Sequence, residues 1–320
     1  MMTPAQVRLN QSPILTNLLL GMGQGTYIAE TLFPRLPQAL RGITLAKLGN
    51  ERLKRYNLRR TPGSETKKIE IKFEGKFYTL DQYAVEVPMP RELMEEADES
   101  RRLNVGNYLD VSQIAMTTVR DVLAQDYELD VAGLATLPAT YAAGHTQAYT
   151  GPNKWTATTG TPVTDVRAAS DVIRKKIGKR PNKFVLSADA ATALISNTEV
   201  RTYLPSTQMG PATMDQLKTI LEVDEIVRGD AIWVDANDVG QDVWGNNAIL
   251  AYVPKIGGAG GGNISLAEPA FGFTNVLDGH PYSETPVYRE QLKSWIYGGT
   301  FERRPNVAYN TAAFLFQNPK

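Results

Sequence analysis

The residue types that most often carry enzyme chemistry are scarce in this chain. Among its 320 residues there is no cysteine, and the two histidines are His145 and His280. Each histidine follows a glycine, in a context typical of loops, and no nucleophile motif lies beside it. Thiolate metal sites are excluded outright, and two loop histidines cannot supply the ligands of a zinc or haem centre. We therefore predict no catalytic residue, no metal and no cofactor, and interpret both histidines as structural or solvent-exposed.

One glycine-rich segment superficially resembles a phosphate-binding loop. Residues 257–263 read Gly-Gly-Ala-Gly-Gly-Gly-Asn. A phosphate loop ends in Gly-Lys-Ser/Thr or leads directly into a helix, whereas this segment leads into Ile-Ser-Leu-Ala-Glu-Pro. We interpret it as a surface loop and do not favour a hydrolase or transferase built on it. Paired carboxylates, such as Glu95 with Glu96, are interpreted as solvated charge, because acid–base catalysis needs a carboxyl perturbed by a pocket.

The bulk composition is that of a soluble globular protein. Apolar residues make up 42% of the chain and charged residues 21%, and the length suits one large domain or two ordinary ones. The apolar stretch 14–22 is too short to span a bilayer, and no Ala-x-Ala cleavage site follows it. We expect a protein without a membrane segment, made in a reducing cytoplasm because it has no cysteine.

Charge is distributed unevenly along the chain, although the net charge is zero. Residues 1–80 hold 13 Lys and Arg against 5 Asp and Glu, and the other 240 residues hold 21 against 29. Clustered basic charge can bind nucleic acid by releasing counterions from phosphates. It can also form a solvated face, or dock on the acidic part of another copy of the chain. The charge pattern by itself leaves these three interpretations open.

The N-terminal quarter of the chain looks unable to complete a fold by itself. Glycines and prolines divide the apolar residues of segment 1–50 into short pieces, which predicts an arm that lies on the rest of the chain or on a neighbour. Residues 51–76 predict a long hairpin, because Thr-Pro-Gly-Ser at 61–64 is a turn signal and residues 68–73 alternate charged and apolar side chains. The outgoing run 52–60 is too charged to bury in its own domain, and a lone hairpin is marginally stable. We expect this hairpin to reach onto another subunit.

Two oppositely charged groups of residues are the candidate contacts between subunits. The basic group lies on the predicted hairpin, and the acidic group lies on the segment that follows it. Complementary charge favours register and encounter more than raw affinity. The candidates are Arg52, Lys54, Arg55, Arg59, Arg60, Lys67 and Lys68 on the basic side, and Glu92, Glu95, Glu96, Asp98 and Glu99 on the acidic side.

A long helix is the strongest periodic signal in the middle of the chain. Apolar residues at three- and four-residue spacing, with no interior glycine or proline before the end, predict a spine helix over residues 107–131. Its buried stripe would consist of Tyr108, Val111, Ala115, Val119 and Val122. The segment that follows, up to Gly160, predicts a loosely packed connection because it is rich in Ala, Thr, Gly and Pro.

A compact α/β unit is predicted next. Its first helix covers residues 162–177, with Thr161 as N-cap, Pro162 at the first position and Gly178 as the stop. We predict strands over 184–186, 225–227, 232–234 and 248–253, helices over 188–195 and 214–221, and β-like runs over 286–301 and 307–316. Core packing, rather than base stacking, is the predicted role of Trp233, Trp244, Trp295, Phe271 and Phe273.

Taken in order, these segments resemble the major capsid proteins of tailed bacteriophages, which have the Hong Kong 97-type fold. The resemblance rests first on residues 178–186, Gly-Lys-Arg-Pro-Asn-Lys-Phe-Val-Leu, and on residues 221–229, Leu-Glu-Val-Asp-Glu-Ile-Val-Arg-Gly. Ala-Tyr-Val-Pro at 251–254 and Glu-Pro-Ala-Phe-Gly-Phe-Thr at 268–274 resemble two further family signatures. Arg-Arg-Thr-Pro-Gly at 59–63 resembles the tip of the family's extended loop.

The resemblance implies an α+β fold with four parts. These are an N-terminal arm (1–50), an extended loop (51–76), a peripheral domain with the spine helix (77–160 and 283–320) and an axial domain around symmetry axes (161–282). It also implies self-assembly through hexameric and pentameric capsomers into an icosahedral shell around a double-stranded DNA genome. The protein would be a structural part of the virion, synthesised in the bacterial host cytoplasm, and not an enzyme.

The same resemblance implies the partners. They are further copies of the chain, scaffolding, portal and decoration proteins, and packaged DNA that is contacted weakly and without sequence specificity. The chain begins almost at the arm, which suggests a separate scaffold or none. Lys67 and Lys68 have no identifiable Asn partner, so covalent cross-linking is not predicted. The alternative function is an encapsulin-like nanocompartment shell that encloses protein cargo, for which the fold would be shared.

Overall fold

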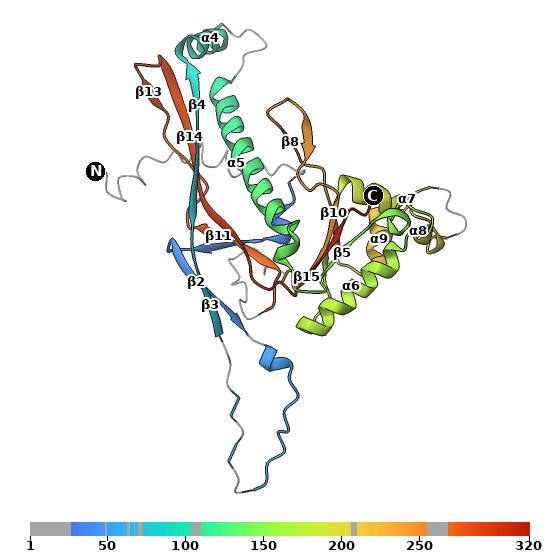
Figure 1. The fold of residues 1–320 in the computed structure, drawn as a ribbon. Helices are drawn as coiled ribbons and strands as arrows, with labels where there is room; N and C mark the ends of the chain where they lie inside the picture. The colour runs from blue at the N-terminus through green and yellow to red at the C-terminus, as the bar shows by residue number, and fades with distance from the viewer. Residues whose placement is uncertain are drawn as a thin grey trace.

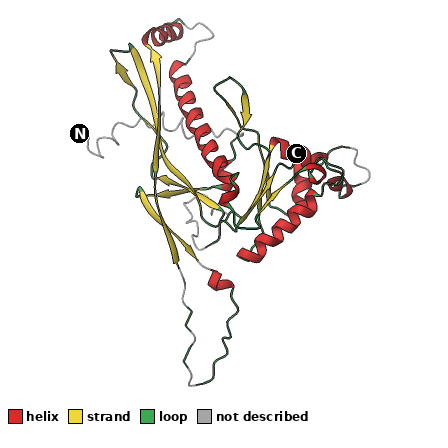
Figure 2. Cartoon of the chain, viewed as in Figure 1, coloured by secondary structure: helices red, strands yellow, loops and turns green. Residues whose placement is uncertain are grey.

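The computed structural model describes residues 27–48, 50–62, 65–66, 68–69, 73–103, 110–205, 210–254 and 268–320. The molecule is elongated: two sheets and a long helix form its body, and a narrow extended loop projects from it (Figure 1). Helices and strands are mixed throughout the body (Figure 2). No described helix is both long and apolar enough to cross a membrane.

A six-stranded sheet centred on the 14-residue strand β14 (Ser294–Val307) forms one half of the body. β14 pairs antiparallel with four other strands, and β1 joins β11 in parallel. Half-buried residues alternate with exposed ones along β4, as expected for a sheet with one dry face. The other five strands are β1 (Arg35–Gln38), β4 (Asp81–Pro90), β11 (Gly272–Leu277), β12 (Tyr282–Ser283) and β13 (Val287–Arg289).

The spine helix α5 (Val111–Ala135) lies along the dry face of this sheet (Figure 1). The predicted range 107–131 is wrong, because Asp110 caps the helix by accepting a hydrogen bond from the Gln113 backbone N–H, and because apolar residues continue to Ala135. The predicted buried stripe is wrong at Val122, which is 45% exposed. Tyr108 lies outside the described residues. The helix instead buries Met116, Leu123, Tyr127, Val131 and Ala132 together with the predicted Val111, Ala115 and Val119.

The α/β unit forms the other half of the body, around a sheet of order β5-β15-β10-β6-β7. Its strands are β5 (Thr146–Ala148), β6 (Lys183–Ser187), β7 (Glu225–Gly229), β10 (Asn247–Ala251) and β15 (Ala313–Gln317). Its helices are α6 (Pro162–Ile177), α7 (Ala188–Ser196), α8 (Thr198–Thr202) and α9 (Met214–Leu221). A small hairpin of β8 (Ile232–Val234) and β9 (Gly240–Asp242) projects from this unit. Two short 3₁₀ turns, η2 (Pro138–Thr140) and η3 (Gly151–Asn153), lie between α5 and α6 along the chain.

Local signals predicted this unit well. Gly178 ends α6 in the left-handed conformation, with φ of 76°, and the Ser187 side chain caps α7 by accepting from the Ala190 N–H. The predicted strands and helices between residues 162 and 253 are confirmed to within two residues. Of the two predicted C-terminal runs, the first contains β13 and most of β14, whereas only the end of the second is a strand, β15.

Strands cross between the two sheets at the domain limits predicted from the sequence, and those limits remain a prediction. β5 and β15 fall within the predicted peripheral domain. β15 pairs with β10 of the α/β unit, and β5 pairs with β15. β11 was placed in the axial domain, but it pairs with β14 and β1. Sequence order could not show this, because each strand's partner is far from it along the chain.

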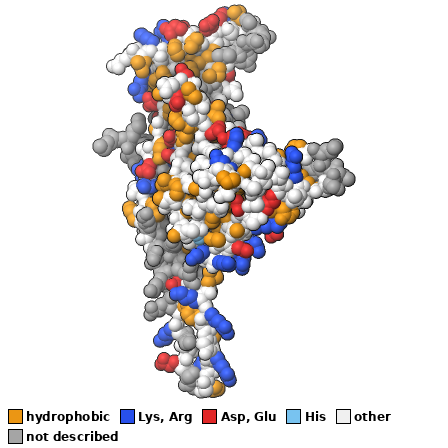
Figure 3. Space-filling model, turned by 45° about the vertical axis from the view of Figure 1, so that its right-hand side comes forward, with side chains coloured by type: hydrophobic (Ala, Val, Ile, Leu, Met, Phe, Trp, Pro, Cys, Tyr) orange, Lys and Arg blue, Asp and Glu red, His pale blue; other side chains and the backbone are white. Residues whose placement is uncertain are grey.

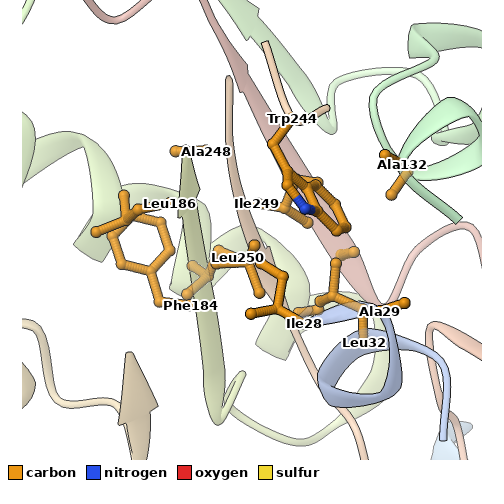
Figure 4. Packing of buried hydrophobic residues seen from close by; sticks show 14 of the residues in the cluster. Ile28, Ala29, Leu32, Ala132, Phe184, Leu186, Trp244, Ala248, Ile249 and Leu250 are labelled. Carbon is orange, nitrogen blue, oxygen red and sulfur yellow. The ribbon is translucent and has the colours of Figure 1, made fainter. Parts of the chain in front are cut away.

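Residues 28–33 of the predicted arm (1–50) lie on the rest of their own chain, which is one of the two seats predicted for the arm. The short helix α3 (Ala29–Leu32) and the residues beside it are buried in the chain's own core, with Leu32 and Phe33 fully buried. Ile28 and Leu32 lie beside Trp244 and Ala132 in the close-up of the core (Figure 4). Residues 1–26 lie outside the described part of the chain.

The strands of the predicted hairpin are not where the pattern placed them. β2 (Gly42–Leu48) pairs antiparallel with β3 (Phe73–Thr79), and this pair is called the ribbon below. After β2 comes the 3₁₀ turn η1 (Asn50–Leu53), and the described residues between 54 and 69 form no strand. The charged run 52–60 has no alternating apolar face that could complete a strand. Residues 49–72, beyond the ribbon, are called the extended loop.

Candidate assembly surfaces

The basic candidates lie on the extended loop, away from the body. Lys54, Arg55, Arg59, Arg60 and Lys68 are exposed, and Lys and Arg side chains mark the projecting loop in the space-filling view (Figure 3). Lys54 has one weak ion pair, with its Nζ 4.0 Å from a Glu51 carboxylate oxygen. The backbone of Arg52 belongs to η1, and Lys67 lies outside the described residues.

The base of the extended loop rests on the α/β unit. At Gly178, the residue that ends α6, an added Cβ would lie 3.1 Å from a methyl carbon of Leu53 in η1. Leu53 therefore packs directly against the glycine backbone. This contact holds the loop base beside the C-terminal end of α6 (Figure 1).

The acidic candidates lie on the helix α4 (Arg91–Arg102), which has no buried residue. Four of them fall at helical positions i, i+3, i+4 and i+7 and so share one face, which we call the acidic ridge. The half-buried Met94 packs from the opposite face. The ridge consists of Glu92, Glu95, Glu96 and Glu99.

Arginines of the same helix partly neutralise this acidic surface. Arg91 Nε lies 3.2 Å from a Glu95 oxygen, and Arg102 pairs with Glu99. Glu96 and Asp98 form no ion pair with any described residue. α4 lies at one end of the molecule and the extended loop at the other (Figure 1). The two candidate surfaces therefore cannot meet within one chain.

A buried arginine that sequence reasoning missed locks the long sheet to the spine helix. Arg303 on β14 is fully buried and donates to Asp126 and Asp130 of α5, at 2.6 Å each. Its guanidinium lies 4.0 Å from the centre of the Tyr83 ring, a cation–π geometry. Burial raises the pKa of the Asp126 carboxyl, and Arg303 opposes that rise. The two acids, at i and i+4 on one helix face, were the available signal.

A buried glutamate joins three distant segments and was also missed. Glu128 of α5 is fully buried and accepts hydrogen bonds from the backbone N–H groups of Ile28 and Ala29 and from Trp244 Nε1, at 2.7–3.1 Å. Burial raises the pKa of this carboxyl, and the hydrogen bonds oppose the rise. A carboxylate three residues before the buried Val131, on the apolar side of the helix, was the only local hint.

Both histidines are packed into the fold. His145 is fully buried and its Nδ1 lies 3.0 Å from the Ala313 carbonyl oxygen. Burial lowers the pKa of both imidazoles. The described residues contain no group of three or more His, Asp or Glu side chains arranged to hold a metal ion. Of the aromatics predicted for the core, Trp244, Phe271 and Phe273 are buried, and Trp233 and Trp295 are half-buried.

Comparison with known proteins decides which family has this arrangement. Residues 140–270 match the family model described as phage major capsid protein E. The major capsid protein of Burkholderia phage BcepMu is 31% identical over 283 residues, which cover 88% of each chain. This chain belongs to the phage major capsid protein family.

Solved structures extend the similarity of this capsid protein to nearly its whole length. A phage-related protein from Bordetella bronchiseptica RB50 is 33% identical, with a TM-score of 0.75 over 97% of both chains. A capsid structure of cyanophage P-SCSP1u is 13% identical, with a TM-score of 0.59 over 92% of this chain and 89% of that one. The second likeness shows the fold alone. The capsid fold and the family predicted from the sequence are confirmed.

Proposed function

We propose that this capsid protein assembles through hexamers and pentamers into an icosahedral shell around the double-stranded DNA of a tailed phage. The observation that carries the proposal is the extended loop, whose exposed basic side chains project from the body. A ribbon of two strands is marginally stable on its own. In a shell, the surface of a neighbouring copy would cover the loop. The protein would act as a structural component of the virion, synthesised in the host cytoplasm, and would catalyse no reaction.

The acidic ridge of a neighbouring copy is the proposed seat of the extended loop. The loop presents Arg59 and Arg60, and the ridge presents Glu95 and Glu96, at opposite ends of one molecule. Opposite ends of like subunits meet when subunits pack head to tail in a ring. The charges would contribute mainly to register and to the rate of encounter, since exposed pairs are each worth less than about 1 kcal/mol.

Charge reversal tests this seat. The double variant Arg59→Glu/Arg60→Glu should remain folded but form no shells, as judged by electron microscopy and analytical ultracentrifugation. Combining it with Glu95→Lys/Glu96→Lys in one chain should restore shells, because the loop and the ridge of every neighbouring pair are then complementary again.

A matched control keeps the charge change but moves it elsewhere. Lys175 and Lys176, exposed at the end of α6, can be reversed to Glu with the same change in net charge. This control should still assemble. Normal shells from Arg59→Glu/Arg60→Glu would contradict the proposed seat, and failure of the control as well would show that net charge alone blocks assembly.

The content of purified particles tests the enclosed cargo. Phage DNA is the expected content, contacted weakly and without sequence specificity, and the near-zero net charge of the chain agrees with weak contact. An encapsulin-like shell would instead enclose protein, but the 31% identity with a phage major capsid protein favours the phage shell. Scaffolding, portal and decoration proteins are the further partners that we propose.

A further inference from the structure

Three consecutive charged residues of β14 point alternately to the two faces of the long sheet. Arg303 faces the spine helix, where it binds Asp126 and Asp130. Strand geometry places Glu302 and Arg304 on the opposite face. That face carries the root of the ribbon, the point where residues 41 and 80 join the ribbon to the body.

Glu302 binds the outgoing strand at this root. The Arg41 guanidinium donates to both Glu302 carboxylate oxygens, at 2.7 and 2.6 Å, and Arg41 directly precedes β2. The Glu302 side chain is 4% exposed and that of Arg41 is 67% exposed. A two-pronged, charge-assisted hydrogen bond to a buried carboxylate fixes direction as well as distance. The Arg41 carbonyl also accepts from the Leu80 N–H, at 2.9 Å, which ties the two strands together.

Arg304 binds the return strand at the same root. Its Nη1 donates to the Thr79 carbonyl oxygen at 3.1 Å and lies 3.4 Å from an Asp81 carboxylate oxygen. Both strands of the ribbon are therefore held on one strand of the long sheet, two residues apart. Within the described part of the chain, no third strand pairs with the ribbon.

We propose that Glu302 and Arg304 are positioning residues that set the direction of the extended loop. The inference rests on the proposed role of that loop in assembly. Since no described strand braces the ribbon, its angle to the body depends on the few groups at its root and on the contact of Leu53 with Gly178. Since Arg303 binds the spine from the same three residues, the loop direction and the position of the spine helix are coupled through β14.

The contacts of Glu302 with Arg41 and of Arg304 with Thr79 and Asp81 are called the clamp below. Removal of the Arg41 side chain tests the clamp, because this exposed arginine can be truncated without opening the core. Arg41→Ala leaves Glu302 buried and without its arginine. The double variant Arg41→Ala/Glu302→Gln neutralises that buried charge, so it should recover stability but not loop direction. Arg289→Ala is the matched control, since it removes an arginine that pairs with Glu86 at 3.6 Å on the same sheet, away from the root.

Loop direction can be measured by double electron–electron resonance, because the chain has no cysteine and spin labels attach only where one is introduced. Glu65→Cys on the loop and Ser196→Cys on α7 mark the two ends of the distance, in full-length chain diluted with unlabelled chain. The parent and the control should show one narrow distance maximum. Arg41→Ala and the double variant should both lose it.

The results separate positioning from stability and from the proposed function. A distance distribution that is unchanged in Arg41→Ala would overturn the inference. Recovery of the narrow distance maximum in the double variant, together with recovery of stability, would also overturn it. If the distribution broadens while shells still form, the clamp stands and the proposed role of the loop in assembly fails. If Arg59→Glu/Arg60→Glu blocks shells while Arg41→Ala leaves the distance unchanged, the proposed function stands and the clamp fails.

Discussion

Charge is buried at the junction around Glu128, whereas it is exposed on the extended loop. Glu128 is withdrawn from water and its carboxylate is satisfied by three segments of its own chain. Arg59 and Arg60 of the loop remain exposed. A buried charge with several partners stabilises the fold only if every partner is present, whereas an exposed charge contributes little to folding and remains accessible to a neighbour. The first region therefore serves folding, and the second is the region that we propose for assembly.

Loss of the buried carboxylate should have the largest effect on folding. Glu128→Ala leaves the N–H groups of Ile28, Ala29 and Trp244 without their acceptor, and should lower the free energy of unfolding by about 3 kcal/mol. Urea denaturation followed by tryptophan fluorescence measures this. Glu128→Gln, which keeps one acceptor oxygen, should lose less. Equal losses in both variants would show that the charge, rather than the acceptor, matters.

A close backbone approach beside the same junction should give the next largest effect. An added Cβ at Gly272 would lie 2.3 Å from a Phe33 ring carbon and 2.8 Å from the Asn306 carbonyl oxygen. Gly272→Ala should therefore cost about 2 kcal/mol through overpacking. Gly210→Ala is the control, because no atom of the described residues lies within 4 Å of its added Cβ. A Gly272→Ala chain as stable as the control would mean that Phe33 repacks freely.

Acid should weaken the root of the ribbon through His280. His280 Nδ1 accepts from the Glu302 N–H at 3.1 Å, so this nitrogen carries no proton. Burial lowers the pKa of His280, the Glu302 carboxylate opposes this, and Arg41 adds to it. The unfolded chain therefore binds the proton first, and stability should fall as the pH drops below about 6.5. Arg41 lowers the pKa of Glu302, which extends the loss in the same direction at lower pH.

The pH effect is measured as the difference between two chains. Denaturation midpoints of the parent and of His280→Gln should converge as the pH falls from 7.5 to 5, since only the parent loses the histidine contribution. His145 is present in both chains, so its contribution to the pH dependence cancels in the difference. Parallel pH profiles would show that His280 does not contribute to the acid sensitivity.

Charge reversal on the loop should have the smallest effect on folding and the largest on assembly. Arg59→Glu/Arg60→Glu should change the free energy of unfolding of the unassembled chain by less than about 0.5 kcal/mol, because both side chains are exposed. The same denaturation experiment as for Glu128→Ala measures it. A loss comparable with that of Glu128→Ala would remove the distinction between the two regions.

Local signals predicted those parts of the fold that form within a turn or two of chain. Pro162 and Gly178 mark the ends of α6, and the Ser187 side chain caps α7 by accepting from the Ala190 N–H, each through contacts a few residues apart. The start of the spine helix was misplaced because the N-cap at Asp110 outweighed the apolar periodicity around it. Such errors are short, since the competing groups are neighbours.

Strand partners could not be predicted in the same way. The ribbon joins β2 to β3 across the whole extended loop, and β15 at the C-terminus lies between β5 and β10. A strand's own sequence shows that it has an apolar face, but it does not show which distant strand will share that face. This is why the strands of the hairpin were misplaced while most elements were predicted correctly.

The sequence alone determined that the extended loop is basic and that the segment after it is acidic. It also determined the lack of thiolate chemistry and the resemblance to phage capsid proteins. Only the tertiary structure decided that the two charged surfaces lie at opposite ends of the molecule, that Glu128 and Arg303 are buried, and that Glu302 and Arg304 hold the ribbon. Composition and spacing report charge and local geometry, which depend on neighbours in the chain. Burial and pairing depend on surfaces from distant segments that come together only when the chain folds.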